Sequence, residues 1–419
     1  MTHFLPGSRS VIFMAVLAAY ICMIDRLAIS IAIIPMANEF TWDARAQGSV
    51  MSAFFLGYVL LQVPAGWLAD RWGGKWVLGV GVLFWSLFTA LTPPAAALGL
   101  GLLLVCRFLM GVFESVTWPA LYNLLVCWVP ARSRGLALGL LNSAVAGGTV
   151  IALVATPLLI THWGWRGAFY AYGSLGFLWC IFWFAKVPNR RVTDGVVQSI
   201  EGDADSDTSD VDTSFPALSI KAAMRLPAIW AMVAAHFATN WVVYLSLAWF
   251  PSMLNRAYGV PLDKVGLYAV IPFLVSVVAT PLAGRLGDML IERGVLRLTV
   301  RKGMQLVSLF GVSACFLLVG LADRLEVALA IFCLGNLLAP ASIAGFGANP
   351  LDLAPRQAGT LYGASNAVAS LAAAAAVYVA GAVLEATDSW ALVFQSAAIV
   401  SITGGLIYWR WAGADRVFR

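Results

Sequence analysis

The stretch "GWLADRWGGK" (residues 66–75) is followed later in the chain by a weaker copy, "GRLGDMLIERG" (284–294). Both copies carry an aspartate at the same place, Asp70 in the first and Asp288 in the second. An ordinary basic loop would not recur at a matching position, so the pair indicates an internal duplication. Many transporters are built from two such halves, with the substrate site where the halves meet.

The composition surrounding this repeat is that of a membrane protein. The chain has 419 residues, of which 61% are hydrophobic and only 11% are charged, whereas soluble domains are about a quarter charged. The mean hydropathy is +0.85. The net charge of +5 comes from basic residues scattered through short loops, so no nucleic-acid partner is expected. The six cysteines have neither metal-ligand nor disulfide spacing, and we interpret them as small core residues.

Apolar runs long enough to cross a bilayer occur in two sets of six. The first set is 11–36, 46–68, 76–94, 98–121, 134–158 and 166–186, and the second is 228–252, 264–286, 303–321, 326–348, 357–382 and 390–411. We therefore expect an all-α integral membrane protein with twelve transmembrane helices. Its N-terminal half would be 1–186, its cytoplasmic linker 187–225 and its C-terminal half 226–419. The acidic run 201–212 is interpreted as solvated linker, although it could also bind a cation or a partner.

Loop charges predict the orientation. Most of the 26 lysines and arginines fall on one side of the membrane if both termini are cytoplasmic, as the positive-inside rule requires. The first apolar run has no small-residue cleavage site, so it is expected to be an uncleaved first helix. We expect a multi-pass protein of a bacterial cell (inner) membrane.

Several stretches carry a family resemblance. The 66–75 motif with its echo resembles the signature loop of the major facilitator superfamily, which implies the fold of that superfamily. Four further stretches resemble the anion:cation symporter family within it: 24–36, 107–140, 236–254 and 349–370. The first is similar to bacterial sugar-acid transporters, and the last two are similar to sialin and to plant organellar phosphate or ascorbate transporters.

The signature motif has a physical role that the residues suggest. Its glycines let two helices approach closely, Asp70 can cap a neighbouring helix N-terminus, and Arg71 and Lys75 hold the cytoplasmic face. The residues assigned to this gating and structural motif are Gly66, Asp70, Arg71, Gly73, Lys75 and Asp288.

Three positions depart from the family pattern. Ser115 follows a fourth-helix glutamate where the family has glycine. Ala144 stands about where sugar-acid members carry an amide, and Thr239 where glutamate-type members carry an arginine. These differences weaken the case for both a polyhydroxylated sugar acid and a glutamate-like dianion as the substrate.

Two adjacent charges interrupt the first span. Asp25 and Arg26 lie in an otherwise apolar run, and charges within a membrane span are functional candidates by default. Arg26 is interpreted as the anchor for an anion, with an internal salt bridge as the alternative. Asp25 points ~100° away around the helix and so needs a different neighbour. An apolar surrounding favours its neutral form, so Asp25 could load and release a proton.

The fourth span carries the other two intramembrane charges, Arg107 and Glu114. They share one helix face but lie ~10 Å apart, so each needs a partner elsewhere. The resemblance implies that Glu114 is a coupling acid and that Arg107 is its partner or gate. The alternative is a static network of Asp25, Arg107 and Glu114 that braces spans one and four.

Polar and aromatic side chains could complete the pocket, although helix packing is about as good an explanation for each. By resemblance Tyr58 and Asn366 match substrate-contacting positions, and the other candidates are Ser365, Tyr244 and Asn240. His236 is expected to be structural, and Trp118 could stack on a ring-bearing substrate or pack in the core.

These expectations combine into a secondary active transporter. It would take up a small organic anion, a carboxylate, together with protons by alternating access, and it would be a monomer in the lipid bilayer. Phosphate or another oxyanion is the second interpretation of the substrate, and a drug or metabolite exporter is the third. No enzyme constellation or metal site is found in the sequence, so neither catalysis nor a cofactor is expected. Protons are the expected coupling ion, and sodium is left open.

Overall fold

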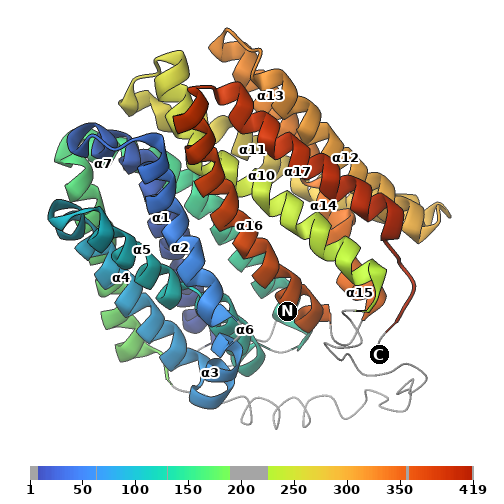
Figure 1. The fold of residues 1–419 in the computed structure, drawn as a ribbon. Helices are drawn as coiled ribbons and strands as arrows, with labels where there is room; N and C mark the ends of the chain where they lie inside the picture. Colours follow the sequence, from blue (N-terminus) through green and yellow to red (C-terminus); the bar gives the residue numbers. More distant parts are fainter. Residues whose placement is uncertain (1–7, 63, 130, 189–224, 355–357, 418–419) are drawn as a thin grey trace. The chain divides into compact units, whose positions relative to one another are not determined.

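The computed structural model describes residues 8–62, 64–129, 131–188, 225–354 and 358–417. Within these ranges all regular structure is helical and there is no strand (Figure 1). The chain divides into two compact units, Met1–Trp42 with Ser49–Ser209 and Asp43–Gly48 with Asp210–Arg419. Most of the predicted linker, including its acidic run, lies outside the described residues.

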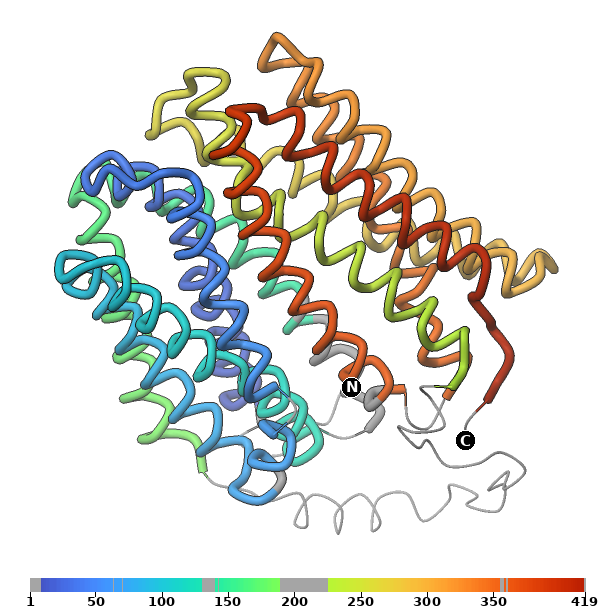
Figure 2. Tube along the Cα trace, viewed as in Figure 1, coloured from blue at the N-terminus to red at the C-terminus, as the bar shows by residue number. Residues whose placement is uncertain are grey.

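The helices of the first unit are α1 (Ser8–Phe40), α2 (Ala44–Gln62, from Ser49 onward), α3 (Pro64–Trp72), α4 (Gly74–Leu98), α5 (Leu100–Glu114), α6 (Thr117–Trp128) and α7 (Ala131–Lys186). Two of them, α1 and α5, carry all four intramembrane charges. α1 packs against α7, and α4 packs against both α5 and α7 (Figure 2). Part of the apolar surface of these helices is buried between them, and Asp25 and Arg26 of α1 and Arg107 and Glu114 of α5 are enclosed there.

Glycines with positive φ lie at several turns between helices of this unit, and Gly73 and Gly164 are two of them. Gly73 (φ 85°) separates α3 from α4, and Gly164 (φ 70°, ψ 168°) bends α7 between the runs predicted as spans five and six. Positive φ is accessible to glycine at little cost, so both turns occur where the sequence supplies that residue. α7 therefore contains two successive helices in one continuous segment.

The second unit contains longer helices and one broken segment. Its elements are α10 (Pro227–Tyr258), α11 (Leu262–Glu292), α12 (Arg297–Val319), α13 (Leu325–Leu338), α14 (Ala341–Ala344), η1 (Phe346–Ala348), α15 (Asn349–Leu353), α16 (Ala358–Thr387) and α17 (Trp390–Trp411). α10 packs against α16 and α17, and α12 packs against α17. The run predicted as one span, 326–348, is thus divided among several short elements.

Ten helices of the described chain are long and apolar enough to cross a membrane. One of them, Ser143–Lys186, includes both helices that meet at Gly164, and α2 is not among the ten. The all-helical architecture is as predicted, whereas the count of twelve spans and the cytoplasmic position of both termini remain predictions.

Candidate functional site

The charged residues of the first unit form a buried group on α1 and α5. Asp25 and Glu114 are completely buried, and Arg26 and Arg107 are only 7% and 1% exposed. Charges removed from water to this degree need paired or hydrogen-bonded neighbours. Those neighbours define what the group can do.

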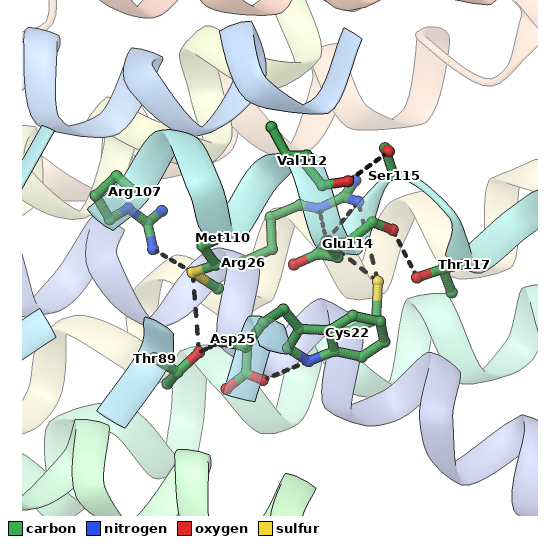
Figure 3. A network of polar contacts seen from close by, with 11 residues as sticks. Cys22, Asp25, Arg26, Thr89, Arg107, Met110, Val112, Glu114, Ser115 and Thr117 are labelled. Atoms are coloured by element: carbon green, nitrogen blue, oxygen red, sulfur yellow. Dashed lines mark hydrogen bonds and ion pairs between the residues drawn. The ribbon is translucent and has the colours of Figure 1, made fainter. Parts of the chain in front are cut away.

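Arg26 and Glu114 form an ion pair between α1 and α5 (Figure 3). Arg26 Nε donates to Glu114 Oε1 at 2.8 Å, and Nη2 lies 2.6 Å from the same oxygen. The second oxygen, Oε2, is buried and has no hydrogen-bond partner in the described part of the chain. The guanidinium therefore engages one side of the carboxylate and leaves the other side open.

A thiol also reaches this carboxylate. Cys22 lies one turn before Arg26 on α1, and its Sγ donates to Glu114 Oε1 at 3.2 Å. Arg26 Nη2 in turn approaches Cys22 Sγ at 3.9 Å. Cys22 was predicted only as a core residue, although its spacing of four from Arg26 could have placed it on the same helix face.

Asp25 contacts a different neighbour, as the turn of the helix predicts. Its Oδ2 accepts a hydrogen bond from Trp85 Nε1 on α4 at 3.1 Å. Its Oδ1 is buried without a partner among the residues described. Asp25 and Glu114 thus share one feature, a single occupied oxygen beside an open one. No sequence signal singled out Trp85.

Arg107 forms no ion pair with Glu114 in the described ranges, as their separation of ~10 Å along one helix leads us to expect. Its role as the partner or gate of Glu114 stays a prediction. The guanidinium donates through Nη1 to Met110 Sδ at 3.0 Å, and Arg107 has no ion-pair partner in the described ranges. Its Nε is buried and unpartnered there as well. No direct hydrogen bond joins Asp25, Arg107 and Glu114 in these ranges, so the proposed static network of the three is not formed by direct contact.

An aromatic pair on α2 lies against both arginines. The Cζ of Arg26 lies 4.7 Å from the Tyr58 ring centroid and 5.3 Å from that of Phe54. The Cζ of Arg107 lies 5.4 Å from the same Phe54 ring. Aromatic faces attract guanidinium groups and stabilise them in place of water. Tyr58 was a predicted site residue, whereas Phe54 was missed, although its spacing of four from Tyr58 could have placed it on the same helix face.

The helix carrying Glu114 ends at that residue. α5 stops at Glu114, and α6 begins at Thr117. Thr117 Oγ1 donates to the Glu114 carbonyl at 2.6 Å, and Ser115 Oγ donates to the Val112 carbonyl at 2.7 Å. These hydroxyls satisfy backbone groups at the break, so the serine that replaces the family's glycine has a local structural use.

The predicted site residues of the second unit lie on two helices that pack together, α10 and α16. Asn240 and Tyr244 are one turn apart on α10, and Ser365 and Asn366 are adjacent on α16; Ser365 is buried and the other three are partly buried. Ser365 Oγ lies 2.9 Å from His236 Nδ1 and donates to the Tyr362 carbonyl.

The His236 ring is enclosed by aromatic neighbours. Its centroid lies 4.7 Å from that of Phe346 and 5.2 Å from that of Tyr362. This stacking agrees with the structural role expected for His236, and it shows that Ser365 already has a partner within its own unit.

The signature motif is mostly helical rather than a loop. Gly66 and Arg71 lie in α3, where the Arg71 guanidinium is 5.3 Å from the Trp67 ring. The Lys75 ammonium is 5.6 Å from the Trp76 ring at the start of α4. In the second copy, Asp288 is exposed within α11, so the expected loop is a continuous helix there.

An amide caps the helix that follows the motif. The Gly74 N–H donates to Asn123 Oδ1 at 2.9 Å, so Asn123 satisfies one of the free amides at the start of α4. The side chain of Asp70, predicted to serve as such a cap, lies outside the described residues.

Comparison with known proteins identifies related sequences. The family model of the Major Facilitator Superfamily matches residues 12–377. Probable anion transporter 1, chloroplastic, of Oryza sativa subsp. japonica is 36% identical over 416 residues, covering 98% of this chain and 78% of that protein. The ascorbate transporter, chloroplastic, of Arabidopsis thaliana is 34% identical, covering 95% and 73%. The sodium-dependent phosphate transport protein 1, chloroplastic, of Arabidopsis thaliana is 33% identical, covering 98% and 80%.

Solved structures show the same fold at low sequence identity. A bacterial homolog to the human lysosomal transporter Spinster, in an inward-facing and occupied conformation, superposes with a TM-score of 0.81 at 16% identity, covering 97% of each chain. The D-xylose–proton symporter gives 0.73 at 14% identity, covering 97% of this chain and 98% of the other.

The relatives correct the predicted location. All three named relatives are chloroplast proteins of plants. The prediction of a bacterial cell (inner) membrane is therefore wrong, and these matches point to an organellar membrane.

Proposed function

The chain belongs to the Major Facilitator Superfamily and is therefore a membrane transporter, and we propose that it is a proton-coupled symporter of a small anion. The observation that carries this proposal is the Arg26–Glu114 ion pair with its open oxygen. The guanidinium of Arg26 is suited to binding carboxylates and oxyanions. Glu114 beside it can release that guanidinium when the carboxylate takes up a proton.

The coupling step follows from charge balance at this pair. When Glu114 is ionised, its charge compensates that of Arg26, and Arg26 attracts a substrate anion less strongly. A proton arriving on Oε2 removes the charge of Glu114, and Arg26 then becomes a buried cation without a counter-ion, which is strongly unfavourable. A substrate anion restores the balance by taking the place of Glu114, so proton binding and anion binding favour each other.

Asp25 is proposed as a second proton acceptor, since its Oδ1 is also open. Ionised Asp25 and Glu114 balance Arg26 and Arg107, so these four buried groups together carry no net charge. Each anionic charge that enters would then be matched by a proton on one of the two acids. Arg107 would stabilise the anion or the ionised acids at longer range.

Alternating access is supported by the duplicated halves and by the two compact units. In this proposal Tyr58, Asn240, Tyr244, Ser365 and Asn366 complete the substrate site. Ser365 would have to exchange its contact with His236 for one with the substrate.

The substrate proposal is a small organic anion bound through a carboxylate. Phosphate is the second candidate, because one relative is named a phosphate transport protein. The name of that relative also describes it as sodium-dependent, so sodium is the alternative coupling ion. Another relative is named an ascorbate transporter, and ascorbate is an anion that has no carboxylate group. A drug exporter is a weaker candidate, because an apolar pocket for lipophilic compounds would not require four buried charges.

The test is transport into proteoliposomes of purified protein with imposed proton or sodium gradients. Phosphate, ascorbate and a panel of small carboxylates serve as labelled substrates. We expect inward proton gradients to drive accumulation, and Arg26→Ala to lower uptake roughly 100-fold, since a hydrogen bond to a charged group contributes about 1.5–3 kcal/mol. Arg324→Ala, an exposed arginine paired with Glu326, is the matched control. Accumulation driven by sodium alone, or Arg26→Ala transporting normally, would reject the proposal.

A further inference from the structure

The Cys22 thiol is the third donor on the coupling carboxylate. It lies 3.2 Å from Glu114 Oε1, the oxygen that also receives Nε and Nη2 of Arg26 (Figure 3). Cys22 is 2% exposed, so no water competes for this contact from bulk solvent. The proposed exchange of Arg26 from Glu114 to an anion would remove two of the three donors and leave only the thiol.

We propose that Cys22 is a positioning residue of the coupling step, which holds Glu114 in place while Arg26 passes to the anion. This role rests on the proposed function. The thiol is neutral and stands on the same helix face as Arg26, so it can stay on Oε1 when the guanidinium leaves. The proton enters at the open oxygen, Oε2, and the thiol keeps its own hydrogen throughout.

The thiol also sets the pH at which Glu114 takes up a proton. A donor to a carboxylate stabilises the ionised form more than the neutral acid. Without that donor the neutral form would be favoured, and Glu114 would be protonated at higher pH. A cysteine is a weak donor, so its contribution is small enough for the proton to be gained and lost within a cycle.

Other cysteines of the chain contact different groups. Cys106 Sγ donates to the Phe88 carbonyl at 3.2 Å, and Cys180 Sγ donates to the Gly79 carbonyl at 3.8 Å. Cys127 Sγ reaches the Asn123 amide oxygen at 3.8 Å. These acceptors are all neutral, whereas the acceptor of Cys22 is a carboxylate. Cys106 is a close control, because it is also buried and its contact distance is the same.

The experiment compares wild type, Cys22→Ala, Cys22→Ser and Cys106→Ala. Uptake of labelled phosphate, ascorbate and the same panel of small carboxylates into proteoliposomes is measured as a function of external pH. We expect Cys22→Ala to shift the pH of half-maximal uptake upward by about one pH unit, the effect of one lost donor to a charged acceptor. Cys22→Ser restores a donor and is expected to keep the wild-type profile, as is Cys106→Ala.

A second measurement covers the case in which Cys22→Ala does not transport. The thermal melting temperature in detergent is followed against pH without substrate, and the deficit of Cys22→Ala relative to wild type is expected to grow as pH rises. A deficit that is independent of pH, or a transport profile equal to wild type, would overturn the role of Cys22 and leave the proposed function standing. Wild-type uptake that does not respond to pH would instead reject the proposed function, and the role of Cys22 with it.

Discussion

Arg26 directs both Nε and Nη2 to a single oxygen of Glu114, at 2.8 and 2.6 Å, and leaves the other oxygen without a donor among the described residues. A purely structural ion pair gains most when both carboxylate oxygens are engaged, as in a two-pronged arginine–carboxylate contact. The one-sided arrangement holds Glu114 firmly and still offers a place for a proton. In the proposed mechanism, this asymmetry is what allows anion binding and proton coupling to be tested separately.

Replacing Glu114 by Gln should separate binding from coupling. The amide keeps the shape of the side chain but carries no charge and takes up no proton, so Arg26 is permanently available to an anion. We expect exchange of labelled phosphate or ascorbate across proteoliposomes to continue, while accumulation against a gradient falls to equilibrium. Glu326→Gln, an exposed glutamate, is the control and should accumulate normally. A Glu114→Gln protein that still concentrates substrate would defeat the coupling assignment.

Replacing Gly111 by Ala should destabilise the first unit. A Cβ at Gly111 would lie 2.0 Å from the Phe54 carbonyl oxygen, and a Cβ at Gly57 would lie 1.9 Å from the Phe108 carbonyl oxygen. α2 and α5 therefore touch backbone to backbone at these two glycines. Overpacking of this kind costs about 1–3 kcal/mol or more, so the melting temperature in detergent should fall.

The control for this change lies on the same helix. At Gly101 of α5, an added Cβ would have no heavy atom of another part of the described chain within 4 Å. Gly101→Ala should therefore leave the melting temperature unchanged or slightly raised, because alanine favours a helix. Equal melting temperatures for the variants at Gly101 and Gly111 would show that α2 and α5 are not in close contact.

Much of the charge pattern could be predicted from the sequence. Asp25, Arg26, Arg107 and Glu114 are conspicuous because their neighbours in sequence are apolar. The separate directions of Asp25 and Arg26 follow from the ~100° step between successive helical residues. The positions of these charges and their directions around the helix depend on one helix at a time, so the local sequence is sufficient to predict them.

The partners of these charges could not be predicted, because they depend on how helices pack. The choice of Glu114 between Arg26 and Arg107 is decided by the register of α1 against α5, which local sequence does not contain. Phe54 meets both arginines only because the two glycine contacts draw α2 onto α5. The division of the run 326–348 was missed for a similar reason, since contacts from α12 stabilise its breaks.

Replacing Asp352 by Asn should destabilise the broken segment of the second unit. Asp352 in α15 accepts from Arg301 Nε at 2.7 Å and from Nη2 at 3.3 Å, and Arg301 Nη1 also donates to the Ala344 carbonyl at 3.0 Å. Arg301 and Asp352 are both buried. Removing one charge of a buried pair costs about 3–5 kcal/mol because the other is left uncompensated, so the melting temperature should drop clearly.

The neighbouring arginine provides a matched comparison. Arg297 Nη1 lies 3.5 Å from Asp352, but its side chain is 56% exposed. Solvent screening limits such contacts to about 0–1 kcal/mol, so Arg297→Ala should melt close to wild type. If Arg297→Ala were as damaging as Asp352→Asn, the buried pair would not be the interaction that holds this segment.

Replacing Trp85 by Phe should produce a loss of stability that depends on pH. The indole Nε1 of Trp85 donates to Asp25 Oδ2 at 3.1 Å, and the ring is completely buried. Phenylalanine keeps an aromatic ring but removes the donor, which leaves an ionised Asp25 with neither oxygen satisfied and costs about 1–3 kcal/mol. Protonated Asp25 loses less, so the deficit in melting temperature should be largest at high pH and shrink as pH falls.

Trp249 separates this effect from the loss of ring volume. It is equally buried, but its Nε1 donates to the Val377 carbonyl at 3.0 Å, a group that does not titrate. Trp249→Phe should therefore show a deficit in melting temperature that stays constant with pH. Parallel curves for the two variants would mean that Asp25 does not change its protonation in this range, and its assignment as a proton acceptor would be lost.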